Sequence, residues 1–239
     1  MISASLLFYF LAYKDSSSNI KRILSLISFC SSVVLKGFPV VFGLYLLKER
    51  RYKDVIFCII FTALLTFLPY LCFEHGFGNI QQHIHSVSLN SLIAEKLTLP
   101  RYGLTFIPNF LINHVSPITY SFLFGAARYL ILILSAVSIC LFFYDSISWK
   151  IIAMLSFVIG YLPSVNWFYL GLFFMPAILL FLHQNEGRKL DYIYAFLFCI
   201  FLNPLQFEIK NIPISWMLSN ISIFTIWIFL IYDVGVKVW

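Results

Sequence analysis

Three long apolar runs, 55–73, 120–144 and 214–232, place the strongest constraint on how this chain can fold. A helix needs roughly 20 apolar residues to cross a hydrocarbon core of about 30 Å, and each run comes close to or exceeds that length. The chain is 61% hydrophobic and only 11% charged, whereas soluble domains carry about 25% charged residues. We therefore predict an all-α, polytopic transmembrane helical bundle that forms a single integral-membrane domain over residues 1–239.

Two further apolar runs are interrupted in the middle, and a third, 191–207, is of borderline length. The run 23–47 breaks at KGFP, and the run 151–182 breaks at LPSVNW. Proline lacks the amide hydrogen that a helix interior uses, and glycine adopts backbone conformations that other residues avoid. We expect two Pro-broken helical hairpins, each entering and leaving the membrane on one side. For 23–47, one long tilted span is the alternative.

The lysines and arginines lie mostly in short loops between the apolar runs, which is the pattern of topology signals. If both hairpins form, eleven of the 16 basic residues share one side: Lys14, Lys21, Arg22, Lys48, Arg50, Arg51, Lys53, Lys150, Arg188, Lys189 and Lys237. We predict that this side is cytoplasmic, with the C-terminus, in a multi-pass protein of the plasma (inner) membrane. The segment 74–119 is then an outer loop. The net charge of +6 forms no groove or tail, so nucleic acid is not an expected partner.

Lys36 is the first candidate for a functional role, because it lies inside an apolar run. A charge near the middle of a bilayer costs at least about 2.5–3.5 kcal/mol on insertion scales. Each half of the broken run spans roughly 18 Å as a helix, which reaches only the middle of the membrane. Lys36 could bind an anionic group such as a lipid phosphate at the helix break. Alternatively, its long side chain could extend along the helix to the cytoplasmic interface.

The stretch LKGFPVVFGLYLLKERRYK, residues 35–53, resembles integral-membrane glycosyltransferases of the C type, most of all glycosyltransferase family 87. SLNSL (88–92) is similar to the family's Asn-x-Ser-Leu segment, and LPSVNWFYLGLFFMPAILL (162–180) to its Ser-Pro…Trp…His…Pro segment. This chain departs from the family in three places. Asn90 directly precedes its serine, a leucine precedes the proline at 163, and Tyr169 is the nearest substitute for the missing histidine.

The resemblance implies a mannosyltransferase-like enzyme that transfers a sugar from a polyprenyl-phosphate donor to an extracytoplasmic glycan or glycolipid. Its partners would be that donor, the acceptor and membrane lipids, and it would use no cofactor and no metal. The family places a catalytic acid in its first outer loop, and nothing in this sequence corresponds to that loop. We therefore expect the chain to be the C-terminal part of such an enzyme, with the missing N-terminal half as a further partner.

Glycosyl transfer requires a carboxylate to deprotonate the acceptor and cations to stabilise the departing phosphate. The catalytic acid is left unknown, with Glu74 and Glu95 of the outer loop as fallbacks. Lys36, Arg101 and Arg128 are the candidate phosphate or lipid ligands, although Arg128 could equally anchor its span and Arg101 could be an ordinary loop charge. The candidate substrate-binding residues are Asn90, Ser91, Asn166, Trp167 and Tyr169. Trp167 could instead belong to an interfacial aromatic belt.

Two other interpretations remain open. The sequence EHGFGNIQQHIH places Glu74 near three histidines and could bind a divalent metal, but its loose spacing favours an ordinary amphiphilic loop start. Two broken runs in corresponding places also suit a secondary transporter or a lipid-sugar flippase, and a non-catalytic membrane subunit is a third possibility. The long outer loop and the scarcity of acids inside the apolar runs favour the enzyme.

Overall fold

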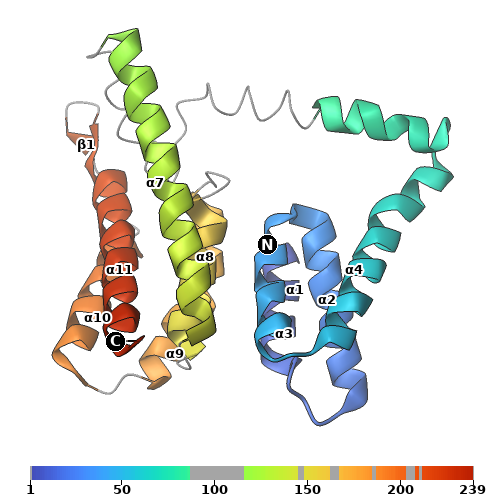
Figure 1. Ribbon diagram of the computed structural model, residues 1–239, viewed down its shortest axis with the longest axis horizontal. Coiled ribbons are helices and arrows are strands. Elements are labelled where there is room, and N and C mark those ends of the chain that lie inside the picture. The colour runs from blue at the N-terminus through green and yellow to red at the C-terminus, as the bar shows by residue number, and fades with distance from the viewer. Residues whose placement is uncertain are drawn as a thin grey trace. The chain divides into compact units, whose positions relative to one another are not determined.

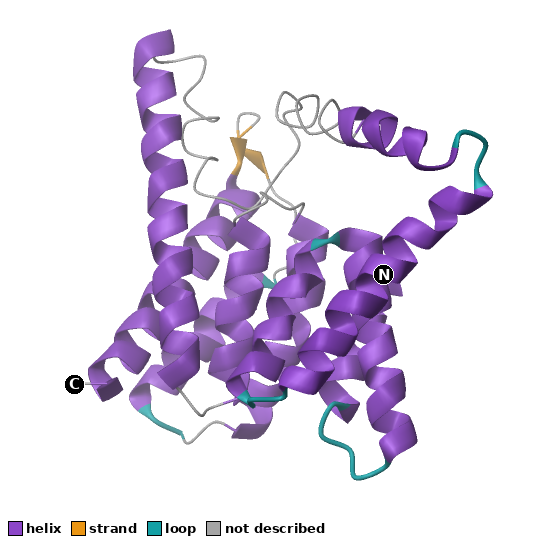
Figure 2. Ribbon diagram, turned by 45° about the vertical axis from the view of Figure 1, so that its right-hand side comes forward, coloured by secondary structure: helices purple, strands orange, loops and turns teal. Residues whose placement is uncertain are grey.

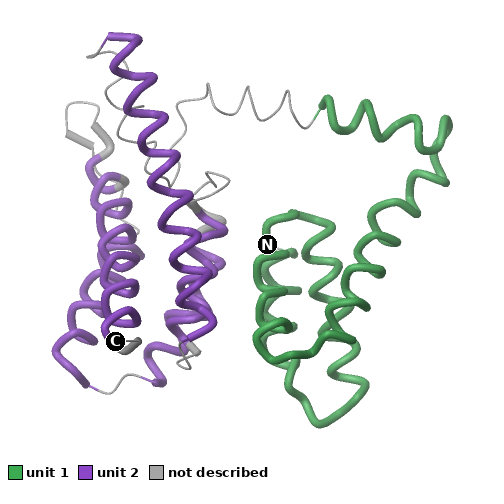
Figure 3. The backbone as a smooth tube through the Cα atoms, viewed as in Figure 1, with its two compact units in different colours: residues 1–99 green, residues 100–239 purple. Residues whose placement is uncertain are grey.

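The computed structural model describes residues 2–86, 116–144, 148–161, 167–184, 187–202, 208–209 and 212–238. The chain forms two compact units, residues 1–99 and 100–239 (Figure 3). We describe each unit by itself. Most of the described residues are helical, and two very short strands accompany the helices (Figure 2). The all-α fold class is thus confirmed, whereas the single-domain organisation stays a prediction.

Unit 1 is built around the long helix α2. Its elements are α1 (Ile2–Tyr13), α2 (Asn19–Lys36), the 3-10 helix η1 (Phe38–Gly43), α3 (Leu44–Lys48), α4 (Tyr52–Phe67), and the 3-10 helices η2 (Leu68–Cys72) and η3 (Gly76–Gly78). Residues 79–86 are also helical. The Ser3 hydroxyl donates to the Ser32 carbonyl oxygen at 3.1 Å, which joins α1 to α2. The Cys30 thiol donates to the Cys58 carbonyl oxygen at 3.7 Å, which joins α2 to α4.

The apolar run 23–47 breaks where the sequence predicts. Helix α2 ends at Lys36 because Gly37 adopts a φ of +65°, a conformation that favours glycine. Pro39 then lies in the first turn of η1, where its missing amide hydrogen does no harm. Lys14, which precedes α2, forms an ion pair with Glu49, which follows α3. The segment 19–48 therefore begins and ends at the same end of unit 1 (Figure 1). A membrane hairpin remains a prediction.

The described part of unit 2 contains five helices and two short strands. Its elements are α7 (Pro117–Tyr144), α8 (Ser148–Tyr161), α9 (Trp167–Gln184), α10 (Lys189–Phe201), β1 (Glu208–Ile209), β2 (Ile212–Pro213) and α11 (Ile214–Val238). Strands β1 and β2 pair in antiparallel fashion, with Glu208 opposite Pro213. Helix α10 is shorter than the apolar run 191–207 that predicts it. Pro204 explains the early end, because residues just before a proline avoid helical conformation.

Helices α8 and α9 pack against each other in antiparallel directions. The Trp149 and Phe181 rings lie 5.0 Å apart at one end, and the Ser156 hydroxyl donates to the Phe173 carbonyl oxygen at 2.9 Å further along. The second predicted break, 162–166, falls between these helices but outside the described residues. Helix α11 packs against α8 through Trp227, whose ring stacks on that of Phe157 with the ring centroids 5.2 Å apart. These aromatic contacts form the core of unit 2.

Three helices in the described part of the chain are long and apolar enough to cross a membrane: Tyr52–Cys72, Pro117–Tyr144 and Met217–Val236. They match the three uninterrupted apolar runs. Helix α4 also exposes large apolar side chains along its length, such as Ile59 at 64% and Leu64 at 54%. Contiguous exposed apolar surface of this kind indicates contact with lipid or with another protein. The chain therefore has the features of a membrane protein.

Candidate functional site

Lys36 occupies the last position of α2, and its side chain is exposed. Fourteen residues separate it from Arg22, the last polar residue before the apolar run, which corresponds to about 21 Å of helix. That length exceeds half of a hydrocarbon core of about 30 Å. Helix α2 continues without a break to Gly37, so it carries Lys36 further from Arg22 than half of such a core. Lys36 thus lies at the end of α2 opposite the Lys14–Glu49 ion pair.

Glu74 follows α4 and η2 in the chain. It lies past the end of these helices that is opposite the Lys14–Glu49 ion pair. Helix α4 starts at Tyr52, directly after Arg51, and the chain runs through η2 to Cys72 before it reaches Glu74. The Asn79 side-chain amide donates to the Glu74 backbone carbonyl oxygen at 2.7 Å, which closes the turn around η3. Lys36 and Glu74 therefore belong to the same end of their respective helices, the end predicted to face outside.

The histidines near Glu74 are also described. His75 adopts a φ of +70° in the turn before η3, and the His83 ring lies 6.4 Å from the Tyr70 ring in an edge-on arrangement. Within the described residues, no group of three or more His, Cys, Asp or Glu side chains is close enough to hold a metal ion.

Arg128 lies on α7 in unit 2, eleven residues after Pro117, which is about 16 Å of helix. Its side chain is exposed, and its guanidinium carbon lies 5.3 Å from the centroid of the Phe124 ring. This cation–π contact within one helix suits a residue that anchors the helix, and it also leaves the guanidinium at the surface.

The other predicted site residues are only partly described. Trp167 and Tyr169 lie in the first turn of α9, immediately after the second break. The remaining candidates lie outside the described residues: Asn90, Ser91, Glu95, Arg101 and Asn166. Of the predicted ligands, Lys36, Arg128 and the fallback acid Glu74 can therefore be placed, and the roles of all of them stay predictions.

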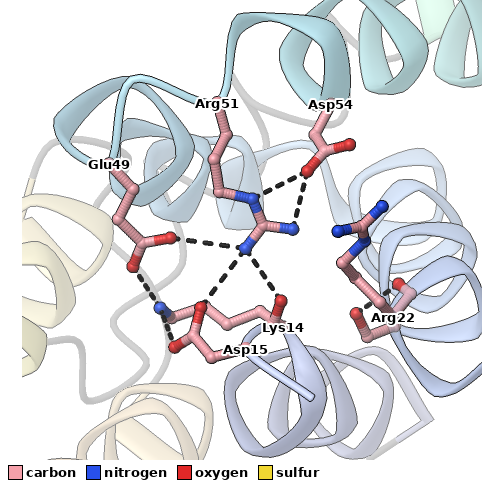
Figure 4. A network of polar contacts seen from close by, with 7 residues as sticks. Lys14, Asp15, Arg22, Glu49, Arg51 and Asp54 are labelled. Atoms are coloured by element: carbon pink, nitrogen blue, oxygen red, sulfur yellow. Dashed lines mark hydrogen bonds and ion pairs between the residues drawn. The ribbon is translucent and has the colours of Figure 1, made fainter. Parts of the chain in front are cut away.

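A network of charged side chains at the other end of unit 1 was not predicted (Figure 4). We call this network of Lys14, Asp15, Glu49, Arg51 and Asp54 the basic-end cluster. The Lys14 ammonium, with its side chain 9% exposed, pairs with Glu49 and with Asp15 at 2.6 Å. The Arg51 guanidinium donates to Asp54 at 2.7 Å and to the Lys14 backbone carbonyl oxygen at 2.8 Å. These contacts join the loop before α2 to the turn after α3.

Two opposing effects act on the Arg51 guanidinium. Burial alone would lower the pKa of Arg51, because a low-dielectric environment disfavours the charged form. Hydrogen bonds and charge interactions with Asp54 and Glu49 outweigh burial and raise this pKa above its ordinary value. Arg51 is therefore held firmly in its charged form, as the centre of the cluster. A hollow of about 730 Å³ opens beside it, lined by Lys14, Asp15, Ser16, Arg22 and residues 50–54.

A second unpredicted network lies at one end of unit 2. The Lys150 side chain is 0% exposed and forms an ion pair with Asp233. Arg188 reaches Asp233 at 3.9 Å and Asp191 at 3.3 Å, and Asp191 also accepts a hydrogen bond from the Arg188 amide at 3.0 Å. The starts of α8 and α10 are thereby tied to the end of α11. Only the Arg188–Asp191 contact had a signal in the sequence, since those two residues lie three positions apart.

Comparison of this chain with models of known protein families, with curated proteins and with solved structures finds no match. The resemblance to glycosyltransferase family 87 accordingly rests on the sequence stretches 35–53, 88–92 and 162–180 alone.

Proposed function

We propose that this chain binds the phosphate of a polyprenyl-phosphate sugar at Lys36 and takes part in membrane glycosyl transfer to an extracytoplasmic glycan or glycolipid. The observation that carries this proposal is the position of Lys36. An exposed lysine ends α2 directly before a glycine with a positive φ, about 21 Å along the helix from the start of the apolar run. If the apolar run starts at one boundary of a hydrocarbon core of about 30 Å, Lys36 lies about 9 Å inside the opposite boundary. Its long side chain can extend from there toward the phosphates of that leaflet.

The surroundings of Lys36 support a site rather than a chance charge. A broken helix at membrane depth is tolerated where its backbone is packed in protein or lines a cavity. Pro39 and Phe42, which follow the break in η1, are both buried, so the break itself is packed while Lys36 remains exposed. A second explanation is that Lys36 only complements the negative end of the α2 helix dipole. Measurements of lipid binding distinguish the two.

The chemistry of the donor fits a lysine in this position. When a sugar leaves a lipid phosphate, negative charge develops on the phosphate oxygens. A fixed cation stabilises that charge more in the transition state than in the ground state. A carboxylate must also take the proton from the acceptor hydroxyl. In this chain Glu74 and Glu95 remain the fallback candidates, since both belong to the predicted outer loop.

The experiment measures binding of a polyprenyl phosphate to the purified chain in lipid nanodiscs. Lys36→Met should weaken binding by about 1.5–3 kcal/mol, the contribution of a hydrogen bond to a charged group. Lys36→Arg should weaken it less, because the guanidinium keeps the charge but has a wider shape. Lys21→Met is the matched control, since Lys21 is an exposed lysine near the other end of the same helix. The control should bind as the unchanged chain does.

Equal binding by Lys36→Met and the unchanged chain would contradict the proposal and leave Lys36 as an interfacial anchor. Polyprenyl alcohol, which lacks the phosphate, should bind equally to all variants. Sugar transfer is measured in the same samples with Glu74→Gln and Glu95→Gln, one of which should abolish any transfer by this chain. Movement of a labelled lipid-sugar across vesicle membranes, without transfer, would instead favour a flippase.

A further inference from the structure

The hollow at the basic end of unit 1 has an excess of positive charge. Its lining includes five basic side chains, those of Lys14, Arg22, Arg50, Arg51 and Lys53, and two acidic ones, a net charge of +3. The neighbouring Glu49, which pairs with Lys14, reduces this to +2. A concave surface with this balance attracts anions.

The acids at this hollow are already paired. Asp15 and Glu49 contact Lys14, and Asp54 contacts Arg51. In contrast, the basic side chains of Arg22, Arg50 and Lys53 are exposed and form no ion pair with any residue that the structure describes. Figure 4 places Arg22 beside the network, on the Asp54 side. Three cations therefore remain to bind an anion from outside the chain.

The hollow lies where the polar and apolar surfaces of unit 1 meet. Arg22 is followed directly by the apolar run that starts at Ile23, and Lys53 lies one residue before Asp54 and the apolar body of α4. Large apolar side chains next to these cations are exposed, among them Ile23 at 48% and Ile56 at 57%. Basic residues at such a boundary lie at the level of lipid headgroups, with acyl chains beside them.

We propose that this hollow binds the phosphate of an anionic phospholipid headgroup in the leaflet next to the basic end. The paired residues of the basic-end cluster fix the floor of the site. Arg22, Arg50 and Lys53 supply the charged hydrogen-bond donors that contact the phosphate. A free phosphate shares this chemistry, but the exposed apolar residues at the rim favour a lipid. This site lies at the opposite end of α2 from Lys36 and does not depend on the proposed function.

Native mass spectrometry of the full chain in neutral detergent tests the proposal, with phosphatidylglycerol as the anionic probe and phosphatidylcholine as the neutral one. Arg22→Gln combined with Lys53→Gln should weaken phosphatidylglycerol binding at least about tenfold, because two charge-assisted contacts are lost. Lys21→Gln combined with Lys189→Gln removes the same charge from exposed lysines that do not line the hollow. That control should weaken binding less than about threefold, because neither lysine lines the hollow and the charges of exposed side chains are largely screened.

Equal losses in the two double variants would overturn the proposal in favour of a general positive surface. Equal binding of phosphatidylcholine and phosphatidylglycerol would overturn it as well. Inorganic phosphate that displaces the lipid at the lipid's own concentration would contradict the lipid as the occupant. Arg22→Lys combined with Lys53→Arg keeps both charges, so it should bind within about threefold of the unchanged chain. A loss in this variant equal to that of the glutamine pair would contradict the assigned role of charge.

Discussion

Lys14 and Lys150 are two lysines that the fold buries, and each is paired with a carboxylate far away in the sequence. Lys14 meets Glu49, 35 residues on, and Lys150 meets Asp233, 83 residues on. Removing a charge from water costs several kcal/mol, and a partner charge with good geometry offsets that cost. The Lys14–Glu49 pair therefore holds the ends of α1 and α3 together in unit 1. The Lys150–Asp233 pair does the same for the start of α8 and the end of α11 in unit 2.

Asp233→Asn should destabilise unit 2 by about 3–5 kcal/mol, because it removes the Asp233 carboxylate that pairs with the buried Lys150 cation. The Lys150 side chain is 0% exposed and that of Asp233 10%, so water cannot easily replace the lost partner. The midpoint of denaturant-induced unfolding in detergent measures the effect. Lys189→Gln, an exposed change nearby, should shift stability by no more than about 0.5 kcal/mol.

The pair can also be replaced as a whole. Lys150→Met combined with Asp233→Leu should recover most of the stability that Asp233→Asn loses, since a buried ion pair and an apolar pair of similar volume are often equivalent. A double variant no more stable than Asp233→Asn would contradict this account of the pair.

The sequence predicted these residues only in part. The grouping of basic residues in loops correctly suggested that Lys14 shares an end with Arg51, and Lys150 an end with Arg188. The partner acids Glu49 and Asp233 were missed. Each lies far along the chain from its lysine, by 35 and 83 residues respectively, and ion pairs at such separations leave no periodic signal in the sequence.

At the scale of elements, Gly37 and Pro39 made the break in 23–47 predictable, because both residues have strong and specific backbone preferences. The length of α2 was less predictable. The apolar run starts at Ile23, whereas the helix starts four residues earlier, at Asn19. Hydrophobicity marks which residues avoid water, and polar residues such as Lys21 also form helix readily. The apolar run alone therefore underestimates the helix.

Gly37→Ala should destabilise unit 1 by about 1–3 kcal/mol, the cost of holding a residue with a Cβ atom in a sparsely populated backbone conformation. No atom lies within 4 Å of the position that the added Cβ would take, so the cost arises from the backbone alone. Gly171→Ala in α9 meets equally open space and should be neutral or stabilise by up to about 1 kcal/mol. The unfolding midpoint of each variant is the measurement. Equal shifts of the midpoint in Gly37→Ala and Gly171→Ala would contradict the assignment of Gly37 as the residue that ends α2.

At the scale of the whole molecule, the predicted runs 55–73, 120–144 and 214–232 lie close to the three candidate spans in the structure. Composition predicts these elements well, because the demand for apolar residues in a membrane is strict. The candidate site residues of the predicted outer loop could not be checked in the same way. Four of the five candidate residues in the outer loop lie within 87–115, outside the described residues: Asn90, Ser91, Glu95 and Arg101. No apolar periodicity guided the prediction in that segment.

The central claim is that unit 1 enters and leaves the membrane on one side between residues 19 and 48, with Lys36 at depth. Labelling of single cysteines in cells tests it most directly, in a chain whose five native cysteines are replaced. Ile20→Cys and Lys53→Cys, both at exposed positions, should resist a membrane-impermeant maleimide in intact cells and react after permeabilisation. Ser88→Cys, in the predicted outer loop, should react in intact cells. Opposite labelling of positions 20 and 53 would contradict the account and make 23–47 a single span.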